Sequence, residues 1–393
     1  MTAPLPLDGI RVLDFTQVML GPCATQMLAD FGADVIKIER PRAGDLSRSS
    51  IEHDPALGDN PVYCSLNRNK RSITIDLRKP EGQAIVYDLV KHADVVVNNF
   101  RPGVMERNNL GYDKLSALNP RIIFAVGTGF GSSGPYQHKG GQDVLAQAMS
   151  GVMARKADPG HPLAIYATAL CDYAAGMHLV QGILAAIIQR QATGHGQVVE
   201  VSLYDSMIAM QMQEAAMQLC QGRDLNWAAM PLSGVFETTD GAVVLVGAFK
   251  ANPLGDICAA LSIDDLSPQY PTLEVQREHK DYLQSVFRDA FATNTTAHWI
   301  ARLEDQDLLC APVKTLADAL DDPQTHHNGM VAEVGYVNGT PLKLVASPVH
   351  MSDAPFTIRK APPLLGADTD DVLAELGYDD HKIADLREAG LVG

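Results

Sequence analysis

The residue with the clearest chemical potential is Asp172, which stands at the start of the most strongly helical pattern in the 393-residue sequence. The free N–H groups and the dipole of a helix start stabilise a carboxylate by under about 1 kcal/mol, so aspartate is common there for structural reasons alone. The same environment favours an ionised carboxylate that points out from the edge of a sheet. Because a carboxylate can attack a thioester to give a mixed anhydride, Asp172 is also a candidate covalent nucleophile.

Other catalytic patterns are weaker. The spacing GxGxxG occurs at residues 129–134 directly after a predicted strand, but a dinucleotide site requires this turn to open a helix. Here the chain continues into residues 135–141, whose proline and glycine composition predicts a loop, so we interpret 129–134 as a flexible Gly/Ser loop beside an active site. The patterns GxSxG, SxxK and the P-loop are absent, which leaves serine hydrolysis and phosphoryl transfer without support.

The composition excludes several classes of protein. The six cysteines never form CxxC and the twelve histidines never form HExxH, so we expect reduced thiols and no metal site. The net charge of −16 disfavours a nucleic-acid partner. An anionic ligand would have to be met by a local cluster of basic residues.

The elements that position Asp172 alternate between strand and helix. Apolar runs at residues 10–15, 33–39, 72–77, 93–98, 121–126 and 197–203 predict strands, and periodic patterns at 21–29, 80–91, 142–154, 172–190 and 204–219 predict helices. This alternation is typical of an α/β fold with a parallel sheet covered by helices on both faces.

The chain is long enough for two domains. We predict a large domain in residues 1–222, a smaller α+β domain in 223–335 with a hairpin around Thr239, and a return to the large domain in 336–393. No apolar run approaches the roughly 20 residues that cross a bilayer. The N-terminus lacks the features of a secretory signal, so we expect a cytoplasmic protein that is not bound to a membrane.

Six segments together make the chain resemble the family III CoA-transferases, the group that includes formyl-CoA transferase, carnitine CoA-transferase, the bile-acid-inducible CoA-transferases and α-methylacyl-CoA racemase. They are residues 7–41, 66–77 (LNRNKRSITIDL), 98–103 (NNFRPG), 142–151, 172–205 and 361–391. The resemblance spans nearly the whole chain. It implies an open Rossmann-like large domain, a smaller α+β domain, and two chains interlocked as a homodimer whose active site needs both.

The resemblance assigns Asp172 as the nucleophile, which forms an aspartyl anhydride and then an aspartyl-CoA thioester. It implies that the chain uses acyl-CoA and small carboxylic acids as substrates. The CoA-binding positions of the family map here to Gln17, Met19, Leu20, Arg40, Leu66, Asn69, Lys70, Asn99, Phe100, Arg107 and Lys139. Residues lining the substrate would include Gly140, Gly141 and Gln142.

Three departures narrow the prediction. Formyl-CoA transferase has a glutamine where this chain has Met19, and a four-glycine loop that is absent here, so formyl or oxalate specificity is doubtful. Racemases of the family have a histidine where this chain has Gln142, and an amide cannot serve as the base that removes an α-proton. The prediction is therefore a CoA-transferase, with a racemase-like or isomerase-like enzyme and a catalytically silent CoA-binding protein as alternatives.

Overall fold

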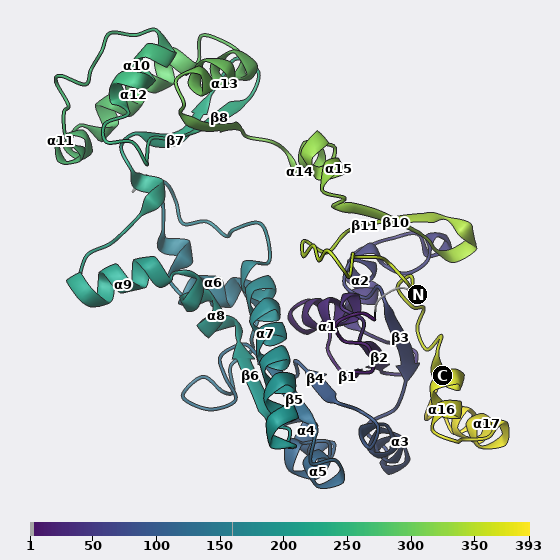
Figure 1. The fold of residues 1–393 in the computed structure, drawn as a ribbon. Helices are drawn as coiled ribbons and strands as arrows, with labels where there is room; N and C mark the ends of the chain where they lie inside the picture. Colours follow the sequence, from purple (N-terminus) through teal and green to yellow (C-terminus); the bar gives the residue numbers. More distant parts are fainter. Residues whose placement is uncertain (1–3, 159) are drawn as a thin grey trace. The chain divides into compact units, whose positions relative to one another are not determined.

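The computed structural model describes residues 4–158 and 160–393. Contacts between residues divide the chain into two compact units, which are both drawn in Figure 1. The first unit contains the residues up to Val152, Ile165–Met210 and Pro323–Gly393, and the second contains Met153–Ala164 and Gln211–Asp322. The divisions thus fall after 152, 164, 210 and 322, whereas the sequence predicts boundaries after 222 and 335.

The first unit is built on a six-stranded parallel sheet with the strand order β3-β2-β1-β4-β5-β6. The strands are β1 (Arg11–Asp14), β2 (Asp34–Glu39), β3 (Lys70–Thr74), β4 (Val95–Asn98), β5 (Ile123–Thr128) and β6 (Val198–Ser202). All five pairings are parallel. The predicted α/β class is confirmed. In a sheet of this order, the strand order reverses between β1 and β4, which is where such folds bind ligands.

Each face of this sheet carries its own apolar core, because successive residues of a strand point to opposite sides. Val12, Val35 and Val95 pack with α1 (Leu20–Asp30) and α7 (Leu170–Thr193). Their neighbours in sequence pack on the opposite face with four helices, α3 (Pro80–Val90), α5 (Tyr112–Leu118), α16 (Thr369–Glu375) and α17 (Asp380–Glu388). The predicted helices at 21–29, 80–91 and 172–190 are therefore present with shifted ends.

Two predicted helices are interrupted. The pattern at 142–154 forms α6 (Asp143–Met149) and then a short 3₁₀ turn, because Gly151 adopts a φ of +88° that ends the helix. The pattern at 204–219 forms α8 (Leu203–Met210) and α9 (Met212–Gln221). None of the residues of α9 is buried, so its methionines are not core residues within this chain.

The edge strand β3 is covered by the end of the chain. The Ser72 N–H donates to Asp368 Oδ2 at 2.8 Å, and the Asp368 N–H donates back to the Ser72 carbonyl at 2.9 Å. Nearby, the Gly393 N–H donates to Thr74 Oγ1 at 2.7 Å. These contacts occupy an edge that would otherwise offer unpaired backbone groups to another strand. A hairpin of β10 (Val331–Gly335) and β11 (Pro341–Val345), which the sequence did not predict, precedes this segment.

The second unit contains an antiparallel sheet of β7 (Ser233–Glu237), β8 (Ala242–Val246) and β9 (Leu309–Pro312). The predicted hairpin is β7–β8. Helices α10 (Leu254–Leu261), α12 (Lys280–Phe291) and α13 (Thr296–Asp305) pack on it, and Phe236, Phe291 and Trp299 form the aromatic part of their common core. The remaining short helices are α2 (Pro61–Cys64), α4 (Val104–Arg107), α11 (Leu273–Glu278), α14 (Leu316–Leu320) and α15 (Pro323–His327).

Helix α7 is the one helix of residues 4–158 and 160–393 that is long and apolar enough to cross a membrane by length and composition. Half of its most apolar stretch is buried within the protein. Leu179, Val180 and Ile183 belong to the core beneath the sheet. The packing of α7 against α1 and β5 therefore accounts for its apolar composition.

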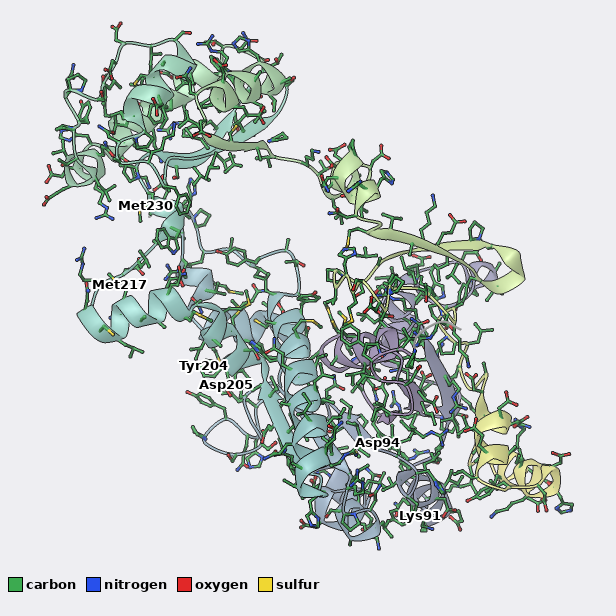
Figure 2. All side chains as sticks on the ribbon, viewed as in Figure 1. Lys91, Asp94, Tyr204, Asp205, Met217 and Met230 are labelled. Atoms are coloured by element: carbon green, nitrogen blue, oxygen red, sulfur yellow. The ribbon has the colours of Figure 1, made fainter. Side chains whose placement is uncertain are left out.

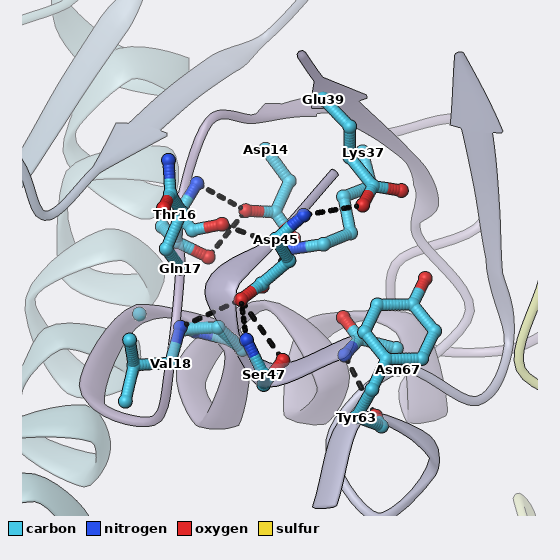
Figure 3. A network of polar contacts seen from close by, with 12 residues as sticks. Asp14, Thr16, Gln17, Val18, Lys37, Glu39, Asp45, Ser47, Tyr63 and Asn67 are labelled. Atoms are coloured by element: carbon cyan, nitrogen blue, oxygen red, sulfur yellow. Dashed lines mark hydrogen bonds and ion pairs between the residues drawn. The ribbon is translucent and has the colours of Figure 1, made fainter. Parts of the chain in front are cut away.

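A buried network of charged side chains lies under the loop between β1 and α1 (Figure 3). Lys70 Nζ contacts Asp14 Oδ2 at 3.0 Å, and Lys37 Nζ contacts Asp45 Oδ2 at 2.8 Å, with all four side chains inaccessible to solvent. Burial raises the pKa of Asp14, but the ammonium groups of Lys70 and Lys37 outweigh that effect and bring it to about 2. Burial lowers the pKa of Lys70 to about 8, so the Asp14–Lys70 pair is charged at neutral pH. Each carboxylate of the network depends on its lysine.

Replacing one lysine should be strongly destabilising. We expect Lys70→Met to lower the free energy of unfolding by about 3–5 kcal/mol, because it leaves Asp14 buried without its partner. The matched control is Lys91→Met. Lys91 (labelled in Figure 2) forms an exposed pair with Asp88 at 2.8 Å, so its loss should cost under about 1 kcal/mol. Urea denaturation of the three proteins measures both effects, and equal losses would contradict the assigned role of Lys70.

Candidate active site

Asp172 is the third residue of α7, and its side chain lines a cavity of about 340 Å³ in the first unit. We call this space the Asp172 cavity. Its walls come from the β1–α1 loop, the segment after β4, the segment after β5 and the start of α6. The Leu20 N–H, at the first turn of α1, donates a hydrogen bond to the Asp172 carboxylate. The carboxylate therefore lies at the N-terminal ends of two helices, α1 and α7.

The start of α7 is held by a residue that the sequence did not single out. Helix α7 begins at Leu170, two residues before the predicted start, and its N-cap residue makes no side-chain cap. Instead, Asp143 Oδ2 accepts hydrogen bonds from the N–H groups of Cys171 at 2.7 Å and Asp172 at 3.1 Å. Gln147 Nε2 donates to Asp143 Oδ1 at 2.6 Å. Asp143 thus fixes the backbone at Asp172 from a different helix.

The charge state of Asp172 differs from the expectation of a permanently ionised acid. Burial, together with the neighbouring negative charge of Asp143, raises the pKa of Asp172 to about 6. The hydrogen bond from Leu20 opposes this change only in part. Neither the burial of Asp172 nor the second carboxylate at the same helix start is visible in the helical pattern of the sequence. Asp172 is still mostly ionised at neutral pH, and a carboxylate of higher pKa is the more reactive nucleophile.

Two thiols near Asp172 are poorly suited to replace it. Cys23 and Cys171 are both buried and free of disulfides. Burial raises the pKa of Cys23 to about 11, and that of Cys171 to about 12. Because the thiolate is the reactive form of cysteine, neither thiol is a strong nucleophile near pH 7.

The β1–α1 loop, residues 15–19, forms one wall of the cavity and is held on both sides. Asn99 clamps Gln17 through two hydrogen bonds, accepting from its N–H at 2.8 Å and donating to its carbonyl at 2.7 Å. Asp45 Oδ1 accepts from the Val18 N–H at 3.0 Å (Figure 3). Val18 has a φ of +67°, which is unfavourable for a β-branched residue. Such a conformation persists only where surrounding contacts determine it, and here they present residues 17–20 to the cavity.

The structure brings most of the predicted site residues together. Eight of them line the Asp172 cavity with Asp172 itself: Gln17, Met19, Leu20, Asn99, Phe100, Lys139, Gly141 and Gln142. A second cavity of about 740 Å³, which we call the Arg40 cavity, shares Gln17, Leu46 and Phe100 with the first. It contains the predicted Arg40 and three further cations, Arg42, Arg78 and Lys79.

Five predicted residues lie outside both cavities. Leu66, Asn69 and Lys70 are buried, and the two polar ones are already engaged, since Asn69 Nδ2 donates to Asp30 Oδ1 at 2.8 Å and Lys70 binds Asp14. The structure therefore gives Lys70 a place in the core, where its ammonium group is paired with Asp14. Arg107 is exposed on α4, and Gly140 lies next to the Asp172 cavity without lining it.

Sequence reasoning missed Asp143, Arg101 and Leu46, which complete the Asp172 cavity or its supports. Asp143 directly follows the predicted Gln142, and Arg101 directly follows the predicted Phe100, so adjacency in the sequence was the available signal. The GxGxxG segment, residues 129–134, forms a loop after β5 as predicted, and part of it lines the cavity. No group of three or more metal-ligating side chains gathers in the part of the chain that the structure describes.

Removing the negative charge of Asp143 should lower the pKa of Asp172. We expect the Asp172 carboxyl to titrate near pH 6 in the unaltered protein and at a lower pH in Asp143→Asn, because a neutral amide no longer opposes its ionisation. Carbon-13 NMR of protein labelled at the aspartate carboxyl carbons measures this titration, with Asp172→Asn to assign the signal. Asp113→Asn, which alters an exposed first-turn aspartate of α5, should leave it unchanged.

Comparison with known proteins identifies the family. Residues 7–369 match the model for CoA-transferase family III. The mouse succinyl-CoA:glutarate CoA-transferase is 34% identical over 98% of this chain and 90% of its own length. A formyl-CoA:oxalate CoA-transferase of Rhodopseudomonas palustris is 30% identical over 98% of this chain and 96% of its own length. A CAIB/BAIF family structure from Brucella suis is 29% identical, covers 95% of this chain and 100% of its own, and superimposes with a TM-score of 0.84. The chain therefore belongs to CoA-transferase family III and is a CoA-transferase.

Proposed function

We propose that this enzyme moves CoA from an acyl-CoA to a free carboxylic acid through covalent intermediates on Asp172. The observation that carries the proposal is a single carboxylate, of raised pKa, that lines a cavity at the start of two helices. The neighbouring thiols are protonated near neutral pH. Asp172 is thus the best nucleophile that the cavity offers to a thioester.

The proposed reaction has four balanced substitutions. The Asp172 carboxylate attacks the thioester carbonyl of the donor and expels CoA thiolate, which leaves an aspartyl anhydride. The thiolate then attacks the aspartyl carbonyl of the anhydride and releases the donor acid, which leaves an aspartyl-CoA thioester. The acceptor carboxylate attacks this thioester and again frees the thiolate, which finally attacks the acceptor's acyl carbon. Asp172 is restored as a carboxylate, and no proton is consumed in the cycle.

Each of these steps places negative charge on a carbonyl oxygen. Backbone N–H groups are well suited to stabilise it, because they are fixed dipoles that need little reorganisation. We propose the N–H groups around Gly140 and Gly141 for this task, since Gly141 lines the Asp172 cavity and neither residue has a side chain to cover its backbone. Gln142 lines the same cavity beside them.

The two cavities fit the two ends of CoA. We propose that the phosphates and adenine lie in the Arg40 cavity, where Arg40, Arg42 and Lys79 supply positive charge in an otherwise acidic chain. Pantetheine would pass along Gln17, Leu46 and Phe100, which line both cavities, and bring the sulfur to Asp172. Lys139, which lines the Asp172 cavity, would add a further positive charge for the CoA moiety. Lys70 would then act by holding Asp14 beneath the β1–α1 loop, and Asn69 by holding Asp30 at the end of α1.

The relatives indicate small dicarboxylic acids as substrates. The mouse and Rhodopseudomonas proteins are named for glutarate and oxalate, respectively. Met19 and the absence of a four-glycine loop separate this chain from the formyl/oxalate pattern, so we propose acids of about the size of succinate or glutarate. We also propose, from the family resemblance, that the enzyme works as an interlocked homodimer in the cytoplasm.

A racemase is the less favoured alternative. Proton removal from the α-carbon requires a base, and none of the residues that line the Asp172 cavity is a histidine. Gln142 occupies the position of the racemase base and cannot accept that proton. Uptake of deuterium at the α-carbon, without any acceptor acid, would identify racemisation.

The experiment is a panel of acyl-CoA donors against carboxylate acceptors, with CoA exchange followed by mass spectrometry. We expect exchange with the unaltered protein, and a covalent adduct on the peptide that contains Asp172 after trapping with hydroxylamine or borohydride. Asp172→Ala should lower exchange by at least about a thousandfold, because it removes the nucleophile.

The matched control is Asp205→Ala. Asp205 (labelled in Figure 2) is also a first-turn aspartate, in α8, but it lines neither cavity. This variant should retain full activity. If Asp172→Ala kept exchange at the level of Asp205→Ala, the covalent mechanism would be wrong. If the unaltered protein bound CoA but gave neither exchange nor adduct, it would be a catalytically silent CoA-binding protein.

A further inference from the structure

Arg101 is a cation of the Asp172 cavity for which the reaction proposed above has no use. It lies three residues after the end of β4, lines the cavity together with Asp172, and is exposed. Within residues 4–158 and 160–393, no carboxylate lies within ion-pair distance of it. Other arginines of the same unit are paired, such as Arg48 with Glu39 at 2.7 Å and Arg190 with Asp94 at 2.8 Å. Arg101 therefore has its charge available for a ligand.

Gly140 leaves room for the guanidinium, and its neighbour Gly141 lies against another glycine. A Cβ atom at Gly140 would lie 3.1 Å from Arg101 Nη2, so a side chain there would push the guanidinium by a few tenths of an ångström. Gly141 packs against Gly129, where a Cβ would come within 2.4 Å of the Gly129 Cα. This part of the wall consequently consists of backbone alone. The guanidinium is the charged group that remains beside it.

The second cation of the cavity is engaged elsewhere. Lys139 Nζ lies 4.5 Å from the centre of the Tyr136 ring and 4.0 Å from the Met149 sulfur. A cation over an aromatic face is already partly stabilised. Lys139 also carries a point charge, whereas a guanidinium offers a planar fork that matches the two oxygens of a carboxylate.

We propose that Arg101 binds the distal carboxylate of a dicarboxylic acyl group or acceptor acid, and so selects dicarboxylic over monocarboxylic substrates. This inference rests on the proposed CoA transfer. A dicarboxylic substrate brings a second negative charge into a cavity that already holds Asp172, with Asp143 close behind it. That charge needs a cation to compensate its desolvation and repulsion. A monocarboxylic substrate has no distal carboxylate to pair with Arg101 and would leave the guanidinium facing solvent.

The test compares two donors that differ only at the distal end, succinyl-CoA and butyryl-CoA. We expect Arg101→Gln to lower kcat/KM for succinyl-CoA by about 10- to 100-fold, the range for loss of a charge-assisted pair, and that for butyryl-CoA by less than about threefold. Arg101→Lys should recover part of the preference, because it restores the charge without the fork. A loss that is equal for both donors, or no loss, would overturn the assignment and place Arg101 with the CoA moiety or outside binding.

The matched control is Lys139→Gln, which removes the other cation of the cavity. It should weaken both donors to the same degree, because they share the CoA moiety. Calorimetry distinguishes the role of Arg101 in binding from the proposed CoA transfer. It measures the affinity of both thioesters for Asp172→Asn and for Arg101→Gln/Asp172→Asn. If the unaltered enzyme exchanged no CoA but these affinities still showed the preference, the proposed reaction would fail while the role of Arg101 stood.

Discussion

The placement of the β1–α1 loop is the constraint on which the site depends. The loop would be free to move without the buried pairs beneath it, in which Asp14 and Asp45 accept from its backbone N–H groups while Lys70 and Lys37 neutralise them. Asn99 adds a clamp from the next strand. This loop delivers the Leu20 N–H to Asp172 and holds Val18 at a positive φ. Buried charge here serves geometry, since ion pairs of this kind seldom add net stability over apolar packing.

At Asp172 burial raises the pKa of the carboxyl, whereas the lysines around Asp14 lower the pKa of that carboxyl. Its pKa of about 6 lies above the ordinary value of 3.8, so the folded protein holds the proton more tightly than the unfolded chain does. Its contribution to stability is therefore fully present below about pH 4 and is lost as the pH rises through 6. At neutral pH the fold keeps a carboxylate in a place that disfavours its charge. A reactive group is commonly maintained in this way by surrounding structure.

Much of the fold could be predicted from sequence, because the buried strands are short apolar runs and α7 has a long periodic pattern. Residues 10–15 and 93–98 contain β1 and β4 for that reason. Asp172 was predictable from its place in that pattern and from the family resemblance. What could not be predicted was burial that depends on partners far along the chain. Asp143 acts across 29 residues, and Lys70 is buried against Asp14, which lies 56 residues earlier and 3.0 Å away.

The covering of β3 by the last segment bears on the order in which the polypeptide can fold as it leaves the ribosome. The second unit is formed almost entirely by residues 211–322 and can close before residues 323–393 are made. The first unit cannot, because Asp368 and Gly393 supply hydrogen bonds to Ser72 and Thr74, which are made some 300 residues earlier. Until those residues emerge, the oldest part of the nascent chain has an open strand edge. The open edge of the sheet at β3 is therefore covered only after Asp368 and Gly393 have been made.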